Sequence, residues 1–302
     1  MKPDKSLSYL IRYLSPKSRI PKSIAKKWIL YRSLINIRKP KPFAPQMLSL
    51  QDDLLREMNQ ARGTFSVEKL EETAPNLIIF MGDLTTLKVD SIINSADFSK
   101  NGYYLPYESV CLDQLLHIFA GIRLRLDIEK LRLEAENLSA AETKGYNLLC
   151  DYIFHRELPN ADSPPTHEQY AALRDAVSSS LKRALELELE SIAIPMLGVD
   201  NRGYPKRETA ENILAVAEAF LRNNSMKIVL CVENPETEEI VRELIKGMSF
   251  EAAVNSEESA KDILRQIRSE EAKNNPAVPK ESVEDMLSGL KNKMGFAFGK
   301  DN

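Results

Sequence analysis

Three short polar segments, each directly after an apolar run, carry the side chains best suited to bind a ligand. In the first, Gly82 permits a tight turn and the carboxylate of Asp83 can accept a hydrogen bond from an amine or a hydroxyl. The second reads Asn-Ser-Ala-Asp from Asn94 to Asp97. The third spans residues 195–205 and can present backbone N–H groups to an anion. Its candidate residues are Gly198, Val199, Asp200 and Asn201.

The elements that must position these segments are predicted by apolar runs that alternate with long amphipathic stretches. The runs predict strands at 77–81, 91–94, 151–154, 191–194 and 227–232. The amphipathic stretches predict helices at 111–136, 168–190, 206–222 and 236–246. These connections are long enough for crossovers between parallel strands, so we expect an α/β fold with a mostly parallel sheet covered on both faces. Ligands bind such sheets at the carboxyl ends of the strands, where the three polar segments lie.

The first 62 residues differ in charge from the rest of the chain. They contain fourteen Lys and Arg against four Asp and Glu, a balance of +10, so the other residues carry -13 of the net charge of -3. Three helices are predicted here, at 7–14, 22–35 and 45–58. Their charges either form a solvated face above an acidic body or dock onto an acidic partner. Nucleic acid is not expected, because neither aromatic nor glycine residues interleave the charges.

The chain therefore divides into three parts. Residues 1–62 form a basic helical extension, and residues 63–250 form the α/β domain. Residues 251–302 form a charged tail, partly helical or disordered.

The composition excludes several classes of protein. No apolar run approaches the roughly 18 residues that a membrane-spanning helix needs, so no membrane partner is expected. The first residues lack the apolar stretch of a secretory signal, and we expect a cytoplasmic protein. Three cysteines, Cys111, Cys150 and Cys231, are too few and too scattered for a disulfide framework, and none forms a CxxC pair.

The order and spacing of the polar segments resemble those of macrodomains, the fold that binds ADP-ribose. Residues 82–85, Gly-Asp-Leu-Thr, followed by 89–97, Val-Asp-Ser-Ile-Ile-Asn-Ser-Ala-Asp, resemble the opening of that family. Residues 112–121 resemble its helix-opening pattern, in which an Asp is followed four residues later by His and then by Ala-Gly. The resemblance spans residues 75–246 and implies a three-layer α/β macrodomain fold.

The basic extension resembles one subgroup of that family. Residues 31–38 and 50–55 are similar to the helical extension of the zinc-dependent macrodomains, which are protein-ADP-ribose hydrolases that remove mono-ADP-ribose from acceptor side chains. The resemblance implies ADP-ribose or a mono-ADP-ribosylated protein as the partner of this chain. Three functions stay open: a hydrolase, a reader that binds ADP-ribose without turnover, and a structural or partner-binding protein with a filled pocket.

The resemblance also implies roles for single residues. Asp83 would accept a hydrogen bond from the adenine amino group, with Leu84 supplying a backbone contact beside it. Asn94 matches the first Asn of the family's Asn-x-Ala-Asn motif, whereas Asp97 replaces the second, which faces the distal ribose. An ionised carboxylate can bind ribose hydroxyls but opposes a nearby diphosphate. Asp113 would orient or activate the attacking water, or else simply cap its helix.

Two loops depart from the family's pattern. Zinc-binding members place Cys and His ligands in the loop that corresponds to residues 102–111, where only Cys111 remains as a thiolate candidate. A zinc site needs three protein ligands, so we expect no zinc cofactor and a buried, packed Cys111. In the phosphate loop Met196 and Leu197 replace two hydroxyl residues, which leaves backbone N–H groups to hold the diphosphate. In the structural alternative, Tyr104 would fill the pocket together with Met196 and Leu197.

Overall fold

The computed structural model describes residues 2–98, 111–135, 138–199 and 202–250. Its strands are β1 (Phe65–Ser66), β2 (Leu77–Met81), β3 (Leu87–Lys88), β4 (Ser91–Ala96), β5 (Ala140–Lys144), β6 (Tyr152–Glu157), β7 (Ser191–Pro195) and β8 (Lys227–Val232). Its α-helices are α1 (Pro3–Leu14), α2 (Ile24–Ile37), α3 (Pro45–Ala61), α4 (Leu112–Ala120), α5 (Ile122–Glu134), α6 (His167–Glu186), α7 (Lys206–Leu221) and α8 (Pro235–Lys246). Across these ranges, no helix combines the length and apolarity needed to cross a membrane.

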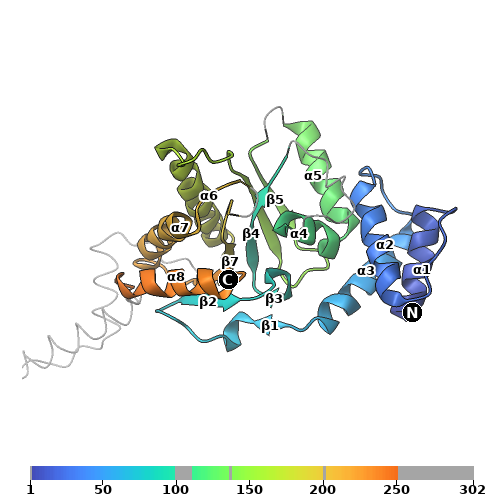
Figure 1. Ribbon diagram of the computed structural model, residues 1–302, viewed down its shortest axis with the longest axis horizontal. Helices are drawn as coiled ribbons and strands as arrows, with labels where there is room; N and C mark the ends of the chain where they lie inside the picture. The colour runs from blue at the N-terminus through green and yellow to red at the C-terminus, as the bar shows by residue number, and fades with distance from the viewer. Residues whose placement is uncertain (1, 99–110, 136–137, 200–201, 251–302) are drawn as a thin grey trace, which may run out of the picture. The chain divides into compact units, whose positions relative to one another are not determined.

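Six strands form the central sheet in the order β2-β8-β7-β4-β6-β5. Figure 1 labels β2, β7, β4 and β5 of this sheet. All neighbours pair in parallel except β5, which runs antiparallel to β6 at the edge. Each of the five strands predicted from apolar runs is present, and β4 extends two residues further, to Ala96, because its whole length pairs with β6. The expected mostly parallel α/β fold is confirmed.

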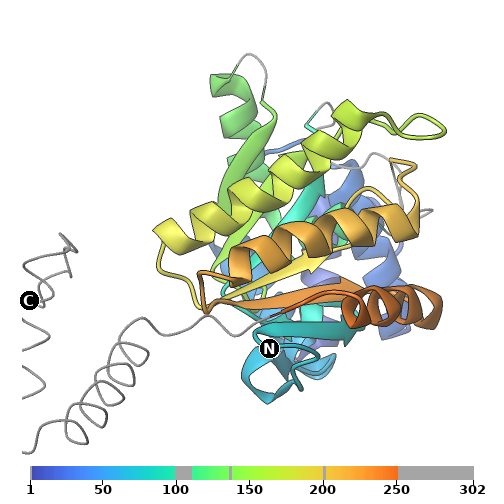
Figure 2. The same ribbon diagram turned by 90° about the vertical axis from the view of Figure 1, so that its left-hand side faces the viewer.

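Alternation along the strands gives the sheet two apolar faces. Ile92 of β4 and Val229 of β8 pack in a cluster with α4 and α5, whereas Ile93 and Ile228 pack in a second cluster with α6, α7 and α8. Figure 2 shows α6 and α7 running side by side over that second face. Helices on both faces hide the sheet from water, which is why its strands read as continuous apolar runs.

The predicted helix at 111–136 is wrong, because the structure contains two helices there. Gly121 separates α4 from α5 with a φ of 94°, a conformation that residues with side chains rarely adopt. A Cβ atom at Gly121 would also lie 2.9 Å from Gln51 Oε1 and 3.1 Å from Leu55 Cδ1, both on α3. The break therefore lets α3 approach the chain closely.

Helices α1, α2 and α3 form a separate helical layer with its own apolar cluster, which includes Leu10, Tyr31 and Leu54 and reaches Ile122 of α5. In Figure 1 this layer lies beside α4 and α5. The layer and the α/β domain belong to one compact unit, Met1–Ala252. The predicted boundary at residue 62 stays a prediction, and the predicted tail, 251–302, lies outside the described residues.

Buried polar side chains join the helical layer to the α4–α5 junction. We call this contact the seam and define it by Gln51, Asp52, Asn59, Arg125 and Asn147. Gln51 Oε1 accepts a hydrogen bond from the backbone N–H of Ile122 at 2.9 Å, which caps the start of α5. Arg125 donates to the carbonyl oxygens of Ile35, Asn36 and Arg38 at the end of α2. The seam therefore satisfies helix ends on both sides.

Candidate functional site

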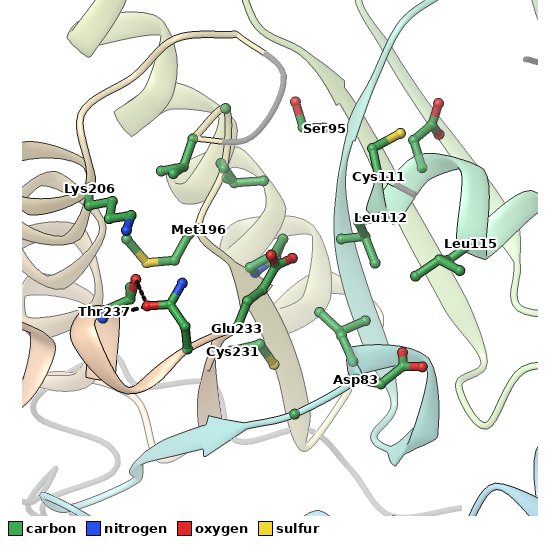
Figure 3. A pocket seen from close by; sticks show the side chains of 18 residues that line it. Asp83, Ser95, Cys111, Leu112, Leu115, Met196, Lys206, Cys231, Glu233 and Thr237 are labelled. Atoms are coloured by element: carbon green, nitrogen blue, oxygen red, sulfur yellow. Dashed lines mark hydrogen bonds between the residues drawn. The ribbon is translucent and has the colours of Figure 1, made fainter. Parts of the chain in front are cut away.

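A cavity of about 440 Å³ opens at the carboxyl ends of β2, β8, β7 and β4, four neighbouring strands of the sheet. Figure 3 shows it between Met196 and Lys206 on one side and Cys111, Leu112 and Leu115 on the other. It forms at this edge because each parallel strand is followed here by a loop that leads to a helix on one face of the sheet.

The cavity brings together residues that the sequence predicted separately. Five of the predicted ligand and catalytic residues line it: Asp83, Leu84, Asp113, Gly198 and Val199. Asn94 and Asp97 are not among the described lining residues. Asp200 and Asn201 lie outside the described residues.

Three helices begin at the cavity, and their first residues line it. These are Leu112 and Asp113 of α4, Lys206 of α7, and Asn234, the N-cap residue of α8. Asn234 caps α8 by accepting the N–H of Thr237, but neither Cys111 before α4 nor Pro205 before α7 provides a side-chain cap. Helix N-termini carry partial positive charge and attract anions. The partial positive charges of these three N-termini therefore reduce the repulsion between an anion and the carboxylates of the cavity wall.

Asp83 forms the lower rim of the cavity in Figure 3. It precedes the 3-10 helix η2 (Leu84–Thr86), and its Oδ1 accepts from the backbone N–H of Thr85 at 2.9 Å and from the Thr85 hydroxyl at 2.6 Å. Oδ2 lies 3.7 Å from Nη1 of Arg62. One carboxylate oxygen thus fixes the side chain, and the other faces a cation without a close hydrogen bond.

Asp113 lies in the cavity wall with only 6% of its surface exposed. Its Oδ1 accepts a hydrogen bond from Asn94 Nδ2 at 2.6 Å. The interpretation of Asp113 as a helix cap is wrong, because the N-cap position of α4 is Cys111 and Asp113 is the second helical residue. Its carboxylate is held by a side chain of the central strand, as a positioned acid–base group needs.

Asn94 connects Asp113 to a buried histidine. Its second amide hydrogen faces His155 Nδ1 at 3.0 Å, so that ring nitrogen must accept, and Nε2–H then donates to Thr143 Oγ1 at 2.9 Å. Burial lowers the pKa of His155 to about 3, and the nearby charge of Asp113 only partly opposes that shift. His155 is therefore neutral at ordinary pH. Asn94 reaches the cavity through Asp113, and its direct contact with a ligand stays a prediction.

His117 lies one helical turn after Asp113, with its Nε2 3.7 Å from Asp113 Oδ1. Burial lowers its pKa to about 3, and the positive charge of Arg125 adds to this effect. The ring is therefore neutral and supplies no positive charge beside the carboxylate of Asp113.

The loop after β7 makes a tight turn at Gly198. Its φ is 79°, and a Cβ atom there would lie 2.7 Å from the ring of Tyr204. The N–H of Val199 donates to the carbonyl of Met196 at 3.3 Å, so this predicted anion donor is engaged within the turn. Leu197 is buried in the core with Tyr204. Met196 and Leu197 line the cavity, and whether they fill it together with Tyr104 stays a prediction, because Tyr104 lies outside the described residues.

Besides Asn234, four polar cavity residues were not predicted from the sequence. Ser95 lies beside Asn94 on β4, and its buried Oγ has no hydrogen-bond partner in the part of the chain that the structure describes. Lys206 supplies a cation and bonds Glu236 at 2.6 Å, and Glu233 points into the cavity in Figure 3. Thr237 completes this side. The polarity of the 94–97 segment was a signal for Ser95, whereas the other three follow from how β7 and β8 end side by side.

Cys111 was expected in the packed interior, and that expectation is wrong. The residue is half-buried and lines the cavity (Figure 3). Within the described ranges, no three His, Cys, Asp or Glu side chains come together as a metal site would need. His117 turns its Nε2 toward Asp113. The described donor set does not fit zinc, and no chemistry is assigned to a metal here.

Comparisons with known proteins agree with this arrangement. A family model described as Macro domain matches residues 107–213. The protein-ADP-ribose hydrolase of Treponema medium is 30% identical over 253 residues, which cover 78% of this chain and 97% of that protein. A protein of the same name from Staphylococcus aureus strain Mu50 is 29% identical and covers 75% of this chain and 87% of its own length. A structure of the Oceanobacillus iheyensis macrodomain with ADP superposes with a TM-score of 0.51 at 26% identity, covering 57% of this chain and 90% of that one.

Proposed function

Because the chain belongs to the macrodomain family, we propose that its cavity binds ADP-ribose and that it releases ADP-ribose from mono-ADP-ribosylated proteins. The observation that carries the proposal is the meeting of five predicted site residues at one cavity, at the edge where three helices begin. The relatives named protein-ADP-ribose hydrolase support the reaction. We also propose that the protein acts in the cytoplasm.

The two ends of the ligand meet different chemistry in this proposal. Asp83 and Leu84 receive the adenine, since a carboxylate oxygen at the rim accepts a hydrogen bond from an exocyclic amine. The diphosphate lies across the N-termini of α4 and α7, next to Gly198. The distal ribose then faces Ser95 and Asp113.

Asp113 acts as the general base in the proposed reaction. It accepts a proton from water as the water oxygen bonds to the anomeric carbon and the bond from that carbon to the acceptor atom breaks. The proton then passes to the departing acceptor. Asn94 donates to Oδ1 and so holds the carboxylate in the cavity wall.

The test combines calorimetry with an activity assay. We expect ADP-ribose to bind with a Kd in the micromolar range, about -8 kcal/mol. We expect Asp113→Asn to keep binding and to slow release of ADP-ribose from a modified protein by about 10²–10⁴-fold. Asp52→Asn is the matched control, because Asp52 is equally buried but lies in the seam, so it should keep turnover.

Each outcome separates the candidate functions. Binding without turnover by the unmodified protein would identify a reader and overturn the hydrolase proposal. No binding would exclude ADP-ribose as the ligand and favour a partner-binding protein. Equal loss of turnover in Asp113→Asn and Asp52→Asn would show that Asp113 is not the general base.

A further inference from the structure

A side chain of the helical layer contacts the rim of the cavity. Arg62, the C-cap residue of α3, lies 22% exposed against the rim. Its Nη2 donates to Thr85 Oγ1 at 2.6 Å, and its Nη1 lies 3.7 Å from Asp83 Oδ2. The guanidinium also lies 3.5 Å from the centroid of the Phe119 ring on α4. Arg62 thus touches η2 and α4 at the same time.

The hydrogen bonds around Thr85 have only one possible direction. The hydroxyl has a single proton. Its oxygen lies 2.6 Å from Asp83 Oδ1, and an ionised carboxylate can accept hydrogen bonds but cannot donate them. The hydroxyl must therefore donate to Asp83 and accept from Arg62, which is always a donor. Thr85 is almost fully buried, so the middle of this chain from Arg62 through Thr85 to Asp83 is shielded from water.

The chain fixes which oxygen of Asp83 meets the ligand. Oδ1 already accepts two hydrogen bonds from Thr85, whereas Oδ2 is beyond hydrogen-bond distance of Arg62. The Asp83 side chain is 42% exposed at the cavity rim. Oδ2 is therefore the acceptor offered to a ligand, and its direction depends on the residues that hold Oδ1.

Arg62 is poorly satisfied for a residue with a purely structural role. Its Nε and Nη1 are buried and have no hydrogen-bond partner in the described part of the chain. Burial lowers its pKa, and the charge of Asp83 partly opposes that shift. A buried cation with two unused donors costs stability. Proximity to Asp83 gives a reason for its position that packing against Phe119 alone does not.

We propose that Arg62 is a positioning residue that orients Asp83 toward the exocyclic amine of adenine, so that the end of the helical layer belongs to the nucleoside site. This inference rests on the proposed function. It assigns to Arg62 the preference for a purine that carries an amine, because Oδ2 of Asp83 accepts from an amine and repels a carbonyl. Hypoxanthine, which has a carbonyl at that position, is the matched probe.

The experiment compares binding of ADP-ribose and of its hypoxanthine analogue by calorimetry. We expect the unmodified protein to prefer ADP-ribose, and Arg62→Met to weaken ADP-ribose binding by about tenfold while the analogue changes little. Thr85→Val, which removes the relay but keeps Arg62, should lose the same preference. Arg62→Lys should restore part of it, since an ammonium can still donate to Thr85.

Arg123→Met is the matched control. Arg123 also joins the helical layer to the domain, through Asp52, but lies 46% exposed and does not line the cavity. The Arg123→Met variant should keep the preference for ADP-ribose over its hypoxanthine analogue. Equal weakening of both ligands in Arg62→Met, or an unchanged preference, would overturn the inference while leaving ADP-ribose binding intact. Failure of the unmodified protein to bind either ligand would overturn the proposed function, and this inference with it.

Discussion

The seam and the cavity both collect polar side chains, but they use them in opposite ways. In the seam, Gln51, Asn147 and Arg125 are buried, and each makes two or more hydrogen bonds with groups on other elements. In the cavity, Ser95 keeps an unpartnered Oγ among the described residues, and Asp83 offers an oxygen to solvent. Satisfied buried groups join segments, whereas unsatisfied ones at a concave surface are available to a ligand.

The largest effect is expected in the seam. Arg125→Met removes a 2% exposed cation that donates to three carbonyl groups at the end of α2. We expect the free energy of unfolding to fall by about 3 kcal/mol, which lowers Tm by roughly 10 °C in a domain of this size. Thermal unfolding measures it, with the half-exposed Arg123→Met as the control. A similar Tm for both variants would show that burial in the seam does not matter.

The next effect is expected at the tight turn beside the cavity. Gly198→Ala and Gly203→Ala both place a side chain at a φ near 80°, but only at Gly198 does the new Cβ meet the Tyr204 ring, at 2.7 Å. At Gly203 the nearest atom is 3.8 Å away. We expect Gly198→Ala to cost about 2 kcal/mol more than Gly203→Ala in chemical denaturation, and to weaken ADP-ribose binding. Equal losses of unfolding free energy in the two variants would show that the positive φ causes the strain and that the contact with Tyr204 adds nothing.

The stability of the protein should depend on pH through His155. The pKa of His155 is about 3 in the folded protein, below its ordinary value of 6.5, so the unfolded chain binds more protons between these two pH values. Stability is therefore full above pH 6.5 and falls as the pH falls toward 3.

The variant His155→Gln keeps a donor for Thr143 and removes the titrating ring. The free energy of unfolding at pH 7.5 and pH 4.5 should differ less in His155→Gln than in the unmodified protein, whereas the exposed His167→Gln should change nothing. An unchanged difference in His155→Gln would assign the acid sensitivity to other groups.

The smallest effect is expected at Ser95. Ser95 lines the cavity, so Ser95→Ala should weaken binding of ADP-ribose by about threefold without changing Tm, since one neutral hydrogen bond contributes roughly 0.5–1.5 kcal/mol. Ser91→Ala on the same strand is the control, because its hydroxyl bonds the carbonyl of Ser191 at 3.3 Å, away from the cavity. If Ser91→Ala alters binding and Ser95→Ala does not, Ser95 has no part in the site.

The strands were predictable because a strand that is covered on both faces of the sheet carries apolar side chains along its length, which gives a continuous apolar run. The edge strand β5 reads Ala-Ala-Glu-Thr-Lys, which has no apolar run, and the runs did not predict it. The break at Gly121 was also missed, since the amphipathic pattern continues through it and only the approach of α3 explains the turn. Local patterns thus predict helices and strands, whereas contacts between these elements decide where a helix is interrupted.

The site was predictable to a similar extent. Segments that follow strands of a parallel sheet must meet at one edge, so Asp83 and Gly198 were placed near one another by topology, whereas only the resemblance to macrodomains indicated Asp113. The pairing of Asn94 with Asp113 was not foreseen, because nothing in the sequence gives the direction of a strand side chain relative to a helix nineteen residues later. Ser95, one residue further along β4, lines the cavity instead, since neighbouring side chains on a strand point to opposite faces.

By itself the sequence determined the α/β class, the parallel strands, the charge of the first 62 residues and the carboxyl edge as the place of the site. These properties follow from periodicity and composition, which act over a few residues. The tertiary structure decided which side chains are shared between regions. Arg62 lies on the helical layer yet holds the rim of the cavity, because folding brings residues distant in sequence within hydrogen-bond distance.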